Sequence, residues 1–212
     1  MGAIQMTIEN KYPSYFNSFS VDNDMENSIP FVGWFTIPYA MAWVYWYLMP
    51  FFIYFYCGKK EFYKYVLLVI VMDILGFIFF IVIPIKNRMS WPNEDELSAY
   101  PSFIRDLWNF LSNSKGMQYT MCPSQHIYFT LVPFIFIRKN GFKKIATYFS
   151  LFAIVMITLS VLFLKVHYII DVLVAIALTE IVAWFIEKYP YLSEKLNKGI
   201  TYVNRKLHLE TK

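Results

Sequence analysis

The amino-acid sequence predicts an all-α membrane protein, a polytopic bundle of about five transmembrane helices with an interfacial helix in its outer loop. Three observations support this fold class. Hydrophobic residues make up 58% of the 212 residues and aromatic residues 21%, a more apolar composition than that of ordinary globular domains. Long runs carry few charges or none, and about 20 apolar residues suffice for a helix to cross roughly 30 Å of hydrocarbon. Lys and Arg are spread unevenly over the segments that connect these runs.

Five apolar runs predict the transmembrane helices. In chain order they are residues 31–57, 65–85, 121–137, 145–164 and 166–186. The third run is the shortest, at 17 residues, and a buried re-entrant helix is the alternative to a full span. Asp73 lies within the second run and Glu180 within the fifth. Because a charge inside a bilayer is costly, we expect structural roles for both, with Asp73 in a hydrogen bond between helices.

The segments that flank these runs are more polar. Residues 1–30 lack the basic start and apolar core of a signal peptide, so we expect the first span to act as the insertion signal. Residues 31–187 form the predicted transmembrane domain. Residues 188–212 alternate apolar and basic side chains, which is typical of a helix on the inner membrane surface, with a disordered tail as the alternative. Residues 101–112 have apolar side chains at helical spacing, which predicts the interfacial helix, either a lid beside the site or a packed surface helix.

The distribution of positive charge predicts how the protein lies in the membrane. With five spans, 13 of the 19 Lys and Arg fall on the side that holds residues 58–64, 138–144 and the C-terminal tail. Positive charge marks the cytoplasmic side. We therefore expect a cytoplasmic C-terminus, while the N-terminus and the loop 86–120 are extracytoplasmic. The small size of the chain suggests a bacterial plasma membrane.

The cysteines and histidines do not predict a disulfide or a metal site. Cys57 and Cys122 fall at opposite ends of the membrane in this topology, so they cannot pair. The three histidines do not form a cluster with the spacing of zinc ligands. We expect neither a metal nor another cofactor, and no nucleic-acid partner.

Polar residues from three segments that are distant in the sequence are predicted to meet at the outer membrane face. They are Lys86 and Arg88 after the second span, Ser124 and His126 at the start of the third, and Lys165, His167 and Asp171 between the fourth and fifth. This convergence of titratable side chains follows from the topology alone and indicates a candidate active site.

The residue types suit phosphoryl transfer. His167 and Asp171 are four residues apart and share a helix face, so the carboxylate can hold one imidazole nitrogen and leave the other as a nucleophile or base. His126 can serve as a general acid. Ser124 is the expected N-cap of the third span, where free backbone N–H groups favour an anion. The cations that could neutralise phosphate charge are Lys165, Lys86 and Arg88, and the alternative for them is snorkelling at the membrane interface.

Two stretches resemble motifs of the type-2 phosphatidic acid phosphatase superfamily. They are CPSQH at residues 122–126 and S-x6-H-x3-D at residues 160–171, where the usual signature is K-x6-RP, PSGH and SR-x5-H-x3-D. The resemblance covers roughly residues 80–187. It implies that His167 attacks phosphorus and becomes a phosphohistidine, that Asp171 orients it, and that His126 protonates the leaving alcohol and then activates water or an acceptor hydroxyl. It also implies that Ser124 contacts phosphate oxygens and that the reaction needs no metal.

The sequence departs from this signature in several places. Gln125 replaces the glycine of PSGH, and Val161 stands where the third motif has arginine, so Lys165 is the residue that could supply part of that charge. The first motif is reduced to Lys86-Asn-Arg88, with Trp91-Pro92 following, and five spans stand where the family usually has six. The stretch FLKVHYIID is similar to the branch that contains inositol phosphorylceramide synthases.

From these observations we expect a metal-independent membrane phosphatase that acts on lipid phosphates, with membrane lipid as its surroundings. Transfer of a lipid headgroup to another alcohol would use the same residues. Two further alternatives are a non-catalytic relative, suggested by Gln125 and Val161, and a small transporter, supported only by Asp73 and Glu180.

Overall fold

The computed structural model describes residues 11, 28–83, 85, 91–112 and 122–206, and these residues form helices without a strand. The elements, in chain order, are η1 (Gly33–Phe35), α4 (Thr36–Val82), α5 (Glu94–Ser98), α6 (Ser102–Ser112), α7 (Gln125–Lys139), α8 (Lys144–Phe163), α9 (Ile169–Lys188) and α10 (Tyr191–Lys206). The predicted all-α fold class is confirmed.

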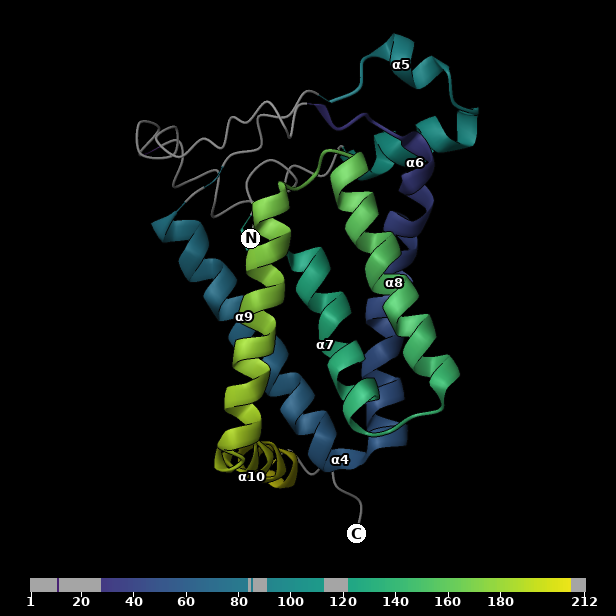
Figure 1. The fold of residues 1–212 in the computed structure, drawn as a ribbon. Helices are drawn as coiled ribbons and strands as arrows, with labels where there is room; N and C mark the ends of the chain where they lie inside the picture. Colours follow the sequence, from purple (N-terminus) through teal and green to yellow (C-terminus); the bar gives the residue numbers. More distant parts are fainter. Residues whose placement is uncertain (1–10, 12–27, 84, 86–90, 113–121, 207–212) are drawn as a thin grey trace.

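Helix α4 is bent into two arms, which correspond to the first two predicted spans. Gly58 has φ 83° and ψ 166°, a backbone conformation that is essentially restricted to glycine, and it interrupts the helix. The first arm, residues 36–57, runs away from the site described below, and the second arm, residues 59–82, returns at an angle, as Figure 1 shows. Residues 58–64, which connect the first two predicted spans, are helical except at Gly58. The chain can turn in so little space because glycine has no Cβ to clash.

Helix α7 is the centre of the bundle, as Figure 1 shows. It has 15 residues and a length of about 22 Å, less than a full hydrocarbon crossing. Side chains along its whole length are buried, including Ile127, Val132 and Ile137. Both arms of α4 pack against it, as do α8 and α9. A helix enclosed on all sides explains why its sequence is apolar without the pattern of an exposed face.

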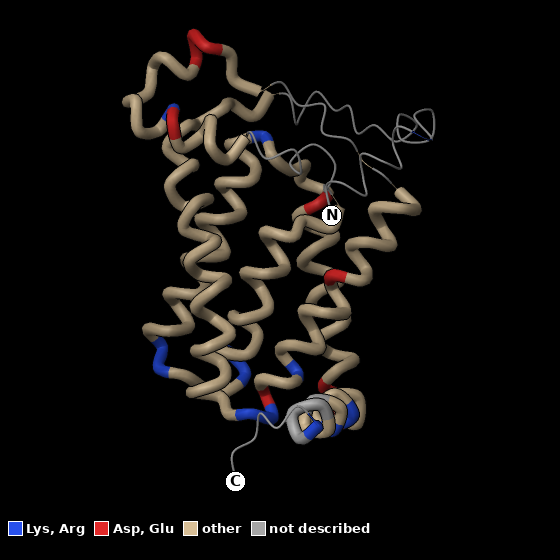
Figure 2. Tube along the Cα trace, turned by 180° about the vertical axis from the view of Figure 1, so that it is seen from behind, with Lys and Arg blue, Asp and Glu red and all other residues tan. Residues whose placement is uncertain are grey.

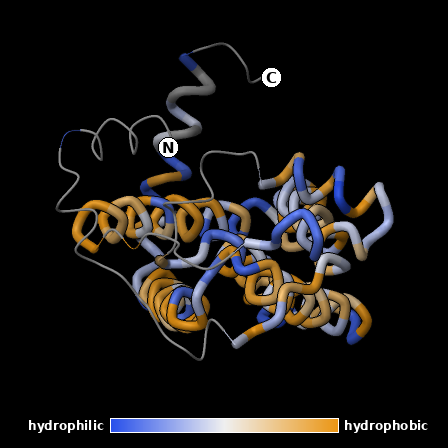
Figure 3. The backbone as a smooth tube through the Cα atoms, turned by 90° about the horizontal axis from the view of Figure 1, so that it is seen from above, coloured by the Kyte–Doolittle hydropathy of each residue, from blue (hydrophilic) through white to orange (hydrophobic). Residues whose placement is uncertain are grey.

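The long helices indicate a membrane protein. Three helical segments among the described residues are long and apolar enough to cross a membrane: Gly33–Val82, Lys144–Phe163 and Ile169–Lys188. Large apolar side chains lie exposed on their outer faces, such as Phe55 and Ile145. In Figure 3, which looks along the bundle, these helices are predominantly hydrophobic, whereas α10 carries hydrophilic segments. An outward-facing apolar surface suits lipid as the surrounding solvent.

The two ends of the bundle are covered differently. At one end lies α6, which is the predicted helix of residues 101–112, and its Trp108 packs edge-on against Phe31 with ring centroids 5.1 Å apart. At the other end, α10 lies across the bundle (Figure 1), so the predicted helix in the tail is also present. Figure 2 shows that most of the Lys and Arg residues gather at the α10 end.

A cluster of charged side chains ties three helices together at the α10 end. Lys64 on the second arm of α4 lies 3.0 Å from Glu61 and 3.1 Å from Glu187 of α9. Lys139, at the end of α7, also pairs with both glutamates. The Lys64 side chain is only 6% exposed. Since a buried ammonium needs partners, this cluster fixes the position of the second arm relative to α7 and α9.

The backbone conformation of Gly58 predicts the effect of a methyl group there. An added Cβ would meet no atom within 4 Å, so replacement of Gly58 by alanine costs backbone strain alone, about 1–3 kcal/mol. Thermal unfolding of the purified protein in detergent should show a lower Tm for Gly58→Ala. The matched control is Gly199→Ala, which also meets no atom within 4 Å but lies in the helix α10, and its Tm should be unchanged or slightly higher. Equal Tm values for the two variants would contradict the role of Gly58.

The charged cluster predicts a second loss of stability. Lys64→Met removes the buried cation and leaves Lys139 to pair with both Glu61 and Glu187, which should cost about 3 kcal/mol. The same unfolding assay measures it. Lys143→Met serves as the control, because Lys143 is exposed and makes no ion pair within the described part of the chain. A Tm for Lys64→Met as high as that of the control would show that the cluster does not hold the helices together.

Candidate active site

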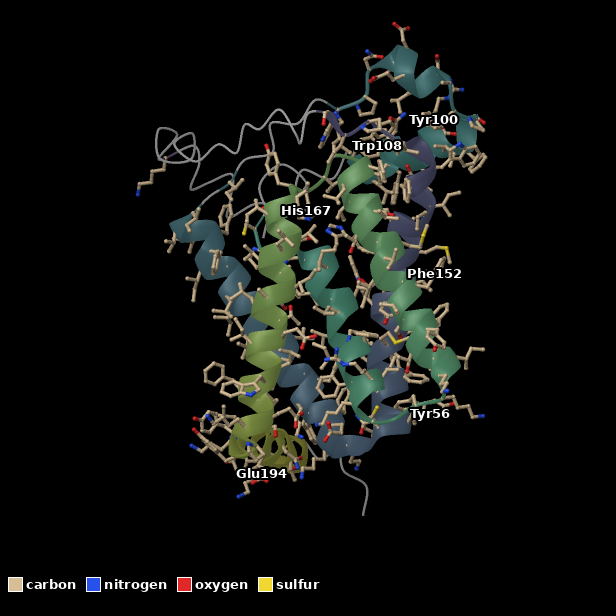
Figure 4. The ribbon with its side chains drawn as sticks, viewed as in Figure 1. Tyr56, Tyr100, Trp108, Phe152, His167 and Glu194 are labelled. Carbon is tan, nitrogen blue, oxygen red and sulfur yellow. The ribbon has the colours of Figure 1, made fainter. Side chains whose placement is uncertain are left out.

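The start of α7 and the start of α9 meet at the end of the bundle opposite α10. The backbone N–H of Ser124 donates a hydrogen bond to the carbonyl of Asp171 at 3.2 Å, which joins the CPSQH stretch to the first turn of α9. Figure 4 shows His167 at this end of the bundle, beside the end of α9. The predicted convergence of these two segments is therefore present in the fold.

The two predicted histidines are in direct contact. Nδ1 of His126 lies 3.1 Å from Nε2 of His167, and the ring centroids are 5.2 Å apart. At this distance one nitrogen donates and the other accepts. His167 is buried, with 3% of its surface exposed, whereas His126 is partly exposed.

The carboxylate of Asp171 lies on the other side of His167. Its Oδ2 is 3.5 Å from Nδ1 of His167, which is an ion-pair distance but longer than a usual hydrogen bond. The same oxygen accepts a hydrogen bond of 2.9 Å from the backbone N–H of Tyr168, which caps the start of α9. Oδ1 is buried and has no hydrogen-bond partner within the described residues. Asp171 thus holds the helix start and remains within reach of His167.

The order Asp171, His167, His126 relates the proton positions of the two imidazole rings to each other. If Asp171 holds a proton on Nδ1 of His167, then Nε2 of His167 carries a lone pair, which accepts the N–H on Nδ1 of His126. The lone pair that could attack an electrophile is therefore bound to His126 in this state. A substrate must displace that hydrogen bond to reach Nε2 of His167.

Aromatic residues from the first arm of α4 hold His126 in place. Tyr39 stacks on its ring with centroids 4.7 Å apart, and the indole of Trp46 lies at 5.3 Å. The indole N–H of Trp46 donates to Thr130 Oγ1 at 2.9 Å, and this hydroxyl donates to the His126 carbonyl at 2.7 Å. Sequence reasoning missed these residues. The available signal was the seven-residue spacing of Tyr39 and Trp46, which places both on one face of a helix.

Val161 has a structural role in place of the family arginine. Its side chain is fully buried in an apolar cluster with Ile127 and Leu164. Its carbonyl accepts hydrogen bonds from the N–H groups of Val166 at 3.0 Å and His167 at 3.1 Å. The residue at this position therefore shapes the turn that carries His167, but it supplies no charge.

Ser124 is the N-cap of α7, as predicted, although its hydroxyl does not cap the helix. The Oγ atom is buried and lacks a hydrogen-bond partner within the described residues. The backbone N–H groups of the first turn of α7 lie next to it. A free hydroxyl at a helix N-terminus is suited to bind an anion.

The predicted cations are only partly described. Lys165 lies in the turn between α8 and α9, two residues before His167, and is 8% exposed. Its φ of 55° is in the left-handed region, which is uncommon for a residue other than glycine. Lys86 and Arg88 lie outside the described residues.

Cys122 is not a competing nucleophile. Burial, together with the nearby charge of Asp171, raises the pKa of its thiol to about 12. The thiolate is the reactive form of cysteine, so this side chain stays neutral near pH 7.

Asp73 and Glu180, the two charged residues within the predicted spans other than Asp171, have partners. Tyr128 donates a hydrogen bond of 2.7 Å to Asp73, which confirms the predicted bond between helices. This bond ties the second arm of α4 to α7 one turn from Gln125. Glu180 pairs with Arg138 at 3.4 Å, near the α10 end and far from the histidines along α7. Neither carboxylate lies against the histidine pair.

Comparison with known proteins agrees with the site. The comparisons with curated proteins and with solved structures gave no match. A family model described as the PAP2 superfamily matches residues 20–185, which include both histidines and Asp171. Members of this superfamily are generally phosphatases or phosphotransferases. The chain therefore belongs to the PAP2 superfamily, the type-2 phosphatidic acid phosphatases, and is a phosphatase-like enzyme of lipid phosphates.

Proposed function

We propose that the protein cleaves a phosphomonoester or diphosphate of a lipid through a phosphohistidine on His167. The observation that carries this proposal is the contact of 3.1 Å between His126 and His167, with Asp171 on the far side of His167. Asp171 lies beside Nδ1 of His167, and His126 contacts the other nitrogen, Nε2, of the same ring. A nucleophile and a general acid need this relation to each other.

The first step transfers the phosphoryl group to the enzyme. The substrate phosphate enters in its monoprotonated form, displaces the hydrogen bond between the histidines and passes its proton to His126. Nε2 of His167 forms a bond to phosphorus while the bond from phosphorus to the leaving oxygen breaks. His126 gives its proton to that oxygen, and the lipid alcohol departs.

The second step returns the enzyme to its starting state. His126, now neutral, takes a proton from water, and the water oxygen attacks phosphorus. The bond from phosphorus to His167 breaks, His126 passes its extra proton to the phosphate, and inorganic phosphate leaves. Because a histidine nitrogen is the nucleophile, the proposed reaction requires no metal.

We propose that three groups bind the phosphate oxygens. The hydroxyl of Ser124 is buried and without a partner within the described residues, and it lies at the N-terminus of α7. Lys165 comes from the turn that carries His167. Lys86 and Arg88 remain proposed contributors on the strength of the sequence. Catalysis of this kind depends on fixed groups that neutralise developing charge.

We also propose that the site faces the extracytoplasmic side, in a bacterial plasma membrane, with the C-terminus in the cytoplasm. The supporting observation is the concentration of Lys and Arg at the α10 end, opposite the histidines (Figure 2). A basic amphipathic α10 would then lie on the anionic inner surface of the membrane.

Transfer of a headgroup to another lipid alcohol is the second candidate. The stretch FLKVHYIID favours it, and so does the packing of Tyr39 and Trp46 against His126, which makes the surroundings of this residue apolar. An acceptor hydroxyl would take the place of water in the second step. Phosphate release from a lipid phosphate supplied alone supports hydrolysis. Headgroup exchange that requires an added alcohol, with no phosphate release, supports transfer.

The proposed roles predict a graded loss of activity. With lipid phosphate in mixed micelles and excess chelator, His167→Ala should lose at least about a thousandfold in kcat/KM, because the nucleophile is gone. His126→Ala should lose about a hundredfold to ten-thousandfold, the usual contribution of a general acid. Asp171→Asn should lose less than His167→Ala.

The control for these variants is His208→Ala, which removes the third histidine of the chain, in the C-terminal tail, and should leave kcat/KM unchanged. Turnover of lipid phosphate by His167→Ala at the unmodified rate would refute the mechanism. A wild-type protein that binds lipid phosphate but turns over none would identify a non-catalytic relative.

A further inference from the structure

A cavity of about 510 Å³ lies between the two arms of α4 and reaches His126. Its walls come from three helical segments. They are Trp43, Trp46, Tyr47 and Pro50 of the first arm, Phe62, Tyr65, Val66, Val69 and Ile70 of the second arm, and Gln125, His126 and Phe129 of α7. The volume is within the range of ordinary ligand sites. Figure 1 shows that the two arms of α4 diverge from the bend.

The two ends of the cavity differ in chemistry. At the level of the active site, Gln125 and His126 provide polar groups. Toward the bend at Gly58 the lining residues are Pro50, Phe62 and Tyr65, all of which carry rings. Between these ends the walls are aliphatic and aromatic. A ligand that fits must have one polar end and one apolar chain.

We propose that this cavity binds a single hydrocarbon chain of the substrate lipid, with the polar end at His126 and the chain directed toward the bend of α4. This inference rests on the proposed function, because His126 is the residue that would protonate the oxygen to which the chain is attached. The space is a consequence of the angle between the arms, so Gly58 contributes to binding without touching the ligand.

The second apolar cavity is a less suitable place for the chain. It has a volume of about 280 Å³ and lies between the first arm and α8, where Met41, Tyr45 and Phe152 line it. Phe152 lies on α8, well away from His167 in Figure 4. None of the residues that line this cavity is a candidate catalytic residue. A chain bound there would not connect directly to His126.

The rings at the far end set a limit on chain length. Phe62 and Ile70 are eight residues apart on the second arm, which corresponds to about 12 Å along the helix. Each methylene that enters the cavity should improve kcat/KM about fourfold until the chain reaches Phe62 and Tyr65. Longer chains should gain little more, because the additional methylenes have no place in the cavity.

The occupant can be identified with a photoreactive probe. A single-chain alkyl phosphonate with a diazirine at the chain end cannot be hydrolysed, so its binding is independent of turnover. We expect crosslinks in the wild-type protein at Pro50, Phe62 or Tyr65, located by mass spectrometry of peptides. Crosslinks confined to the cavity beside α8, or to the outer faces of the helices, would overturn the inference.

A pair of substitutions gives the second part of the test. Val66→Phe fills the middle of the cavity and should reduce the crosslinks at its far end at least tenfold. It should also lower the chain length at which kcat/KM of straight-chain alkyl phosphates stops rising. Ile74→Phe introduces the same ring at an exposed position on the same arm, outside the lining, and should change neither result.

The two parts separate the possible failures. If the wild-type protein turns over no alkyl phosphate and exchanges no headgroup, the proposed function fails, while the crosslinks still decide where a chain binds. If turnover depends on His167 but Val66→Phe has the same dependence on chain length as Ile74→Phe, the cavity is not the chain site. Far-end crosslinks that Val66→Phe removes and Ile74→Phe retains would establish it.

Discussion

The hydrogen bond from the Ser124 N–H to the Asp171 carbonyl holds together the two parts of the site. It places the N-terminus of α7, with the Ser124 hydroxyl, against the first turn of α9. The residues on either side then follow: His126 lies two positions after Ser124, and His167 four positions before Asp171. The contact of 3.1 Å between the rings is possible only because these two helix starts are docked. A hydrogen bond between backbone groups does not depend on the identity of the neighbouring side chains. The junction can therefore form although Gln125 and Val161 differ from the residues of the usual signature.

Contacts elsewhere in the bundle position the helices around this junction. The bend at Gly58 returns the second arm of α4 along α7, where Tyr128 and Asp73 connect them. The first arm brings Tyr39 and Trp46 against His126. The ion cluster around Lys64 fixes the opposite end, so the angle between the arms is determined at the bend and at the bottom of the bundle. The angle between the two arms of α4 therefore determines both the position of His126 and the shape of the apolar cavity beside it.

The sequence predicted the helices and the histidine–aspartate core, because uncharged runs and four-residue spacing are local signals. The helix predicted at residues 101–112 and the helix predicted in the tail of residues 188–212 are present as α6 and α10, since their apolar side chains recur at helical spacing. The bend at Gly58 was missed, because charged residues after a glycine are equally typical of a loop. The contacts of Tyr39, Trp46 and Thr130 with His126 could not be predicted, because contacts between helices depend on the rotation of each helix about its axis. The direct contact between the histidines is likewise a property of the packed bundle.

The central claim is that Nε2 of His167 becomes covalently bonded to phosphorus. The most direct measurement is to mix the enzyme with lipid phosphate, quench with base within milliseconds to seconds, and locate the phosphate by mass spectrometry. The account predicts an acid-labile, base-stable phosphate on His167, which accumulates further in His126→Ala when a good leaving group makes protonation unnecessary. Turnover of the substrate without any phosphate on His167 in either protein, under conditions that preserve a phosphohistidine standard, would contradict it.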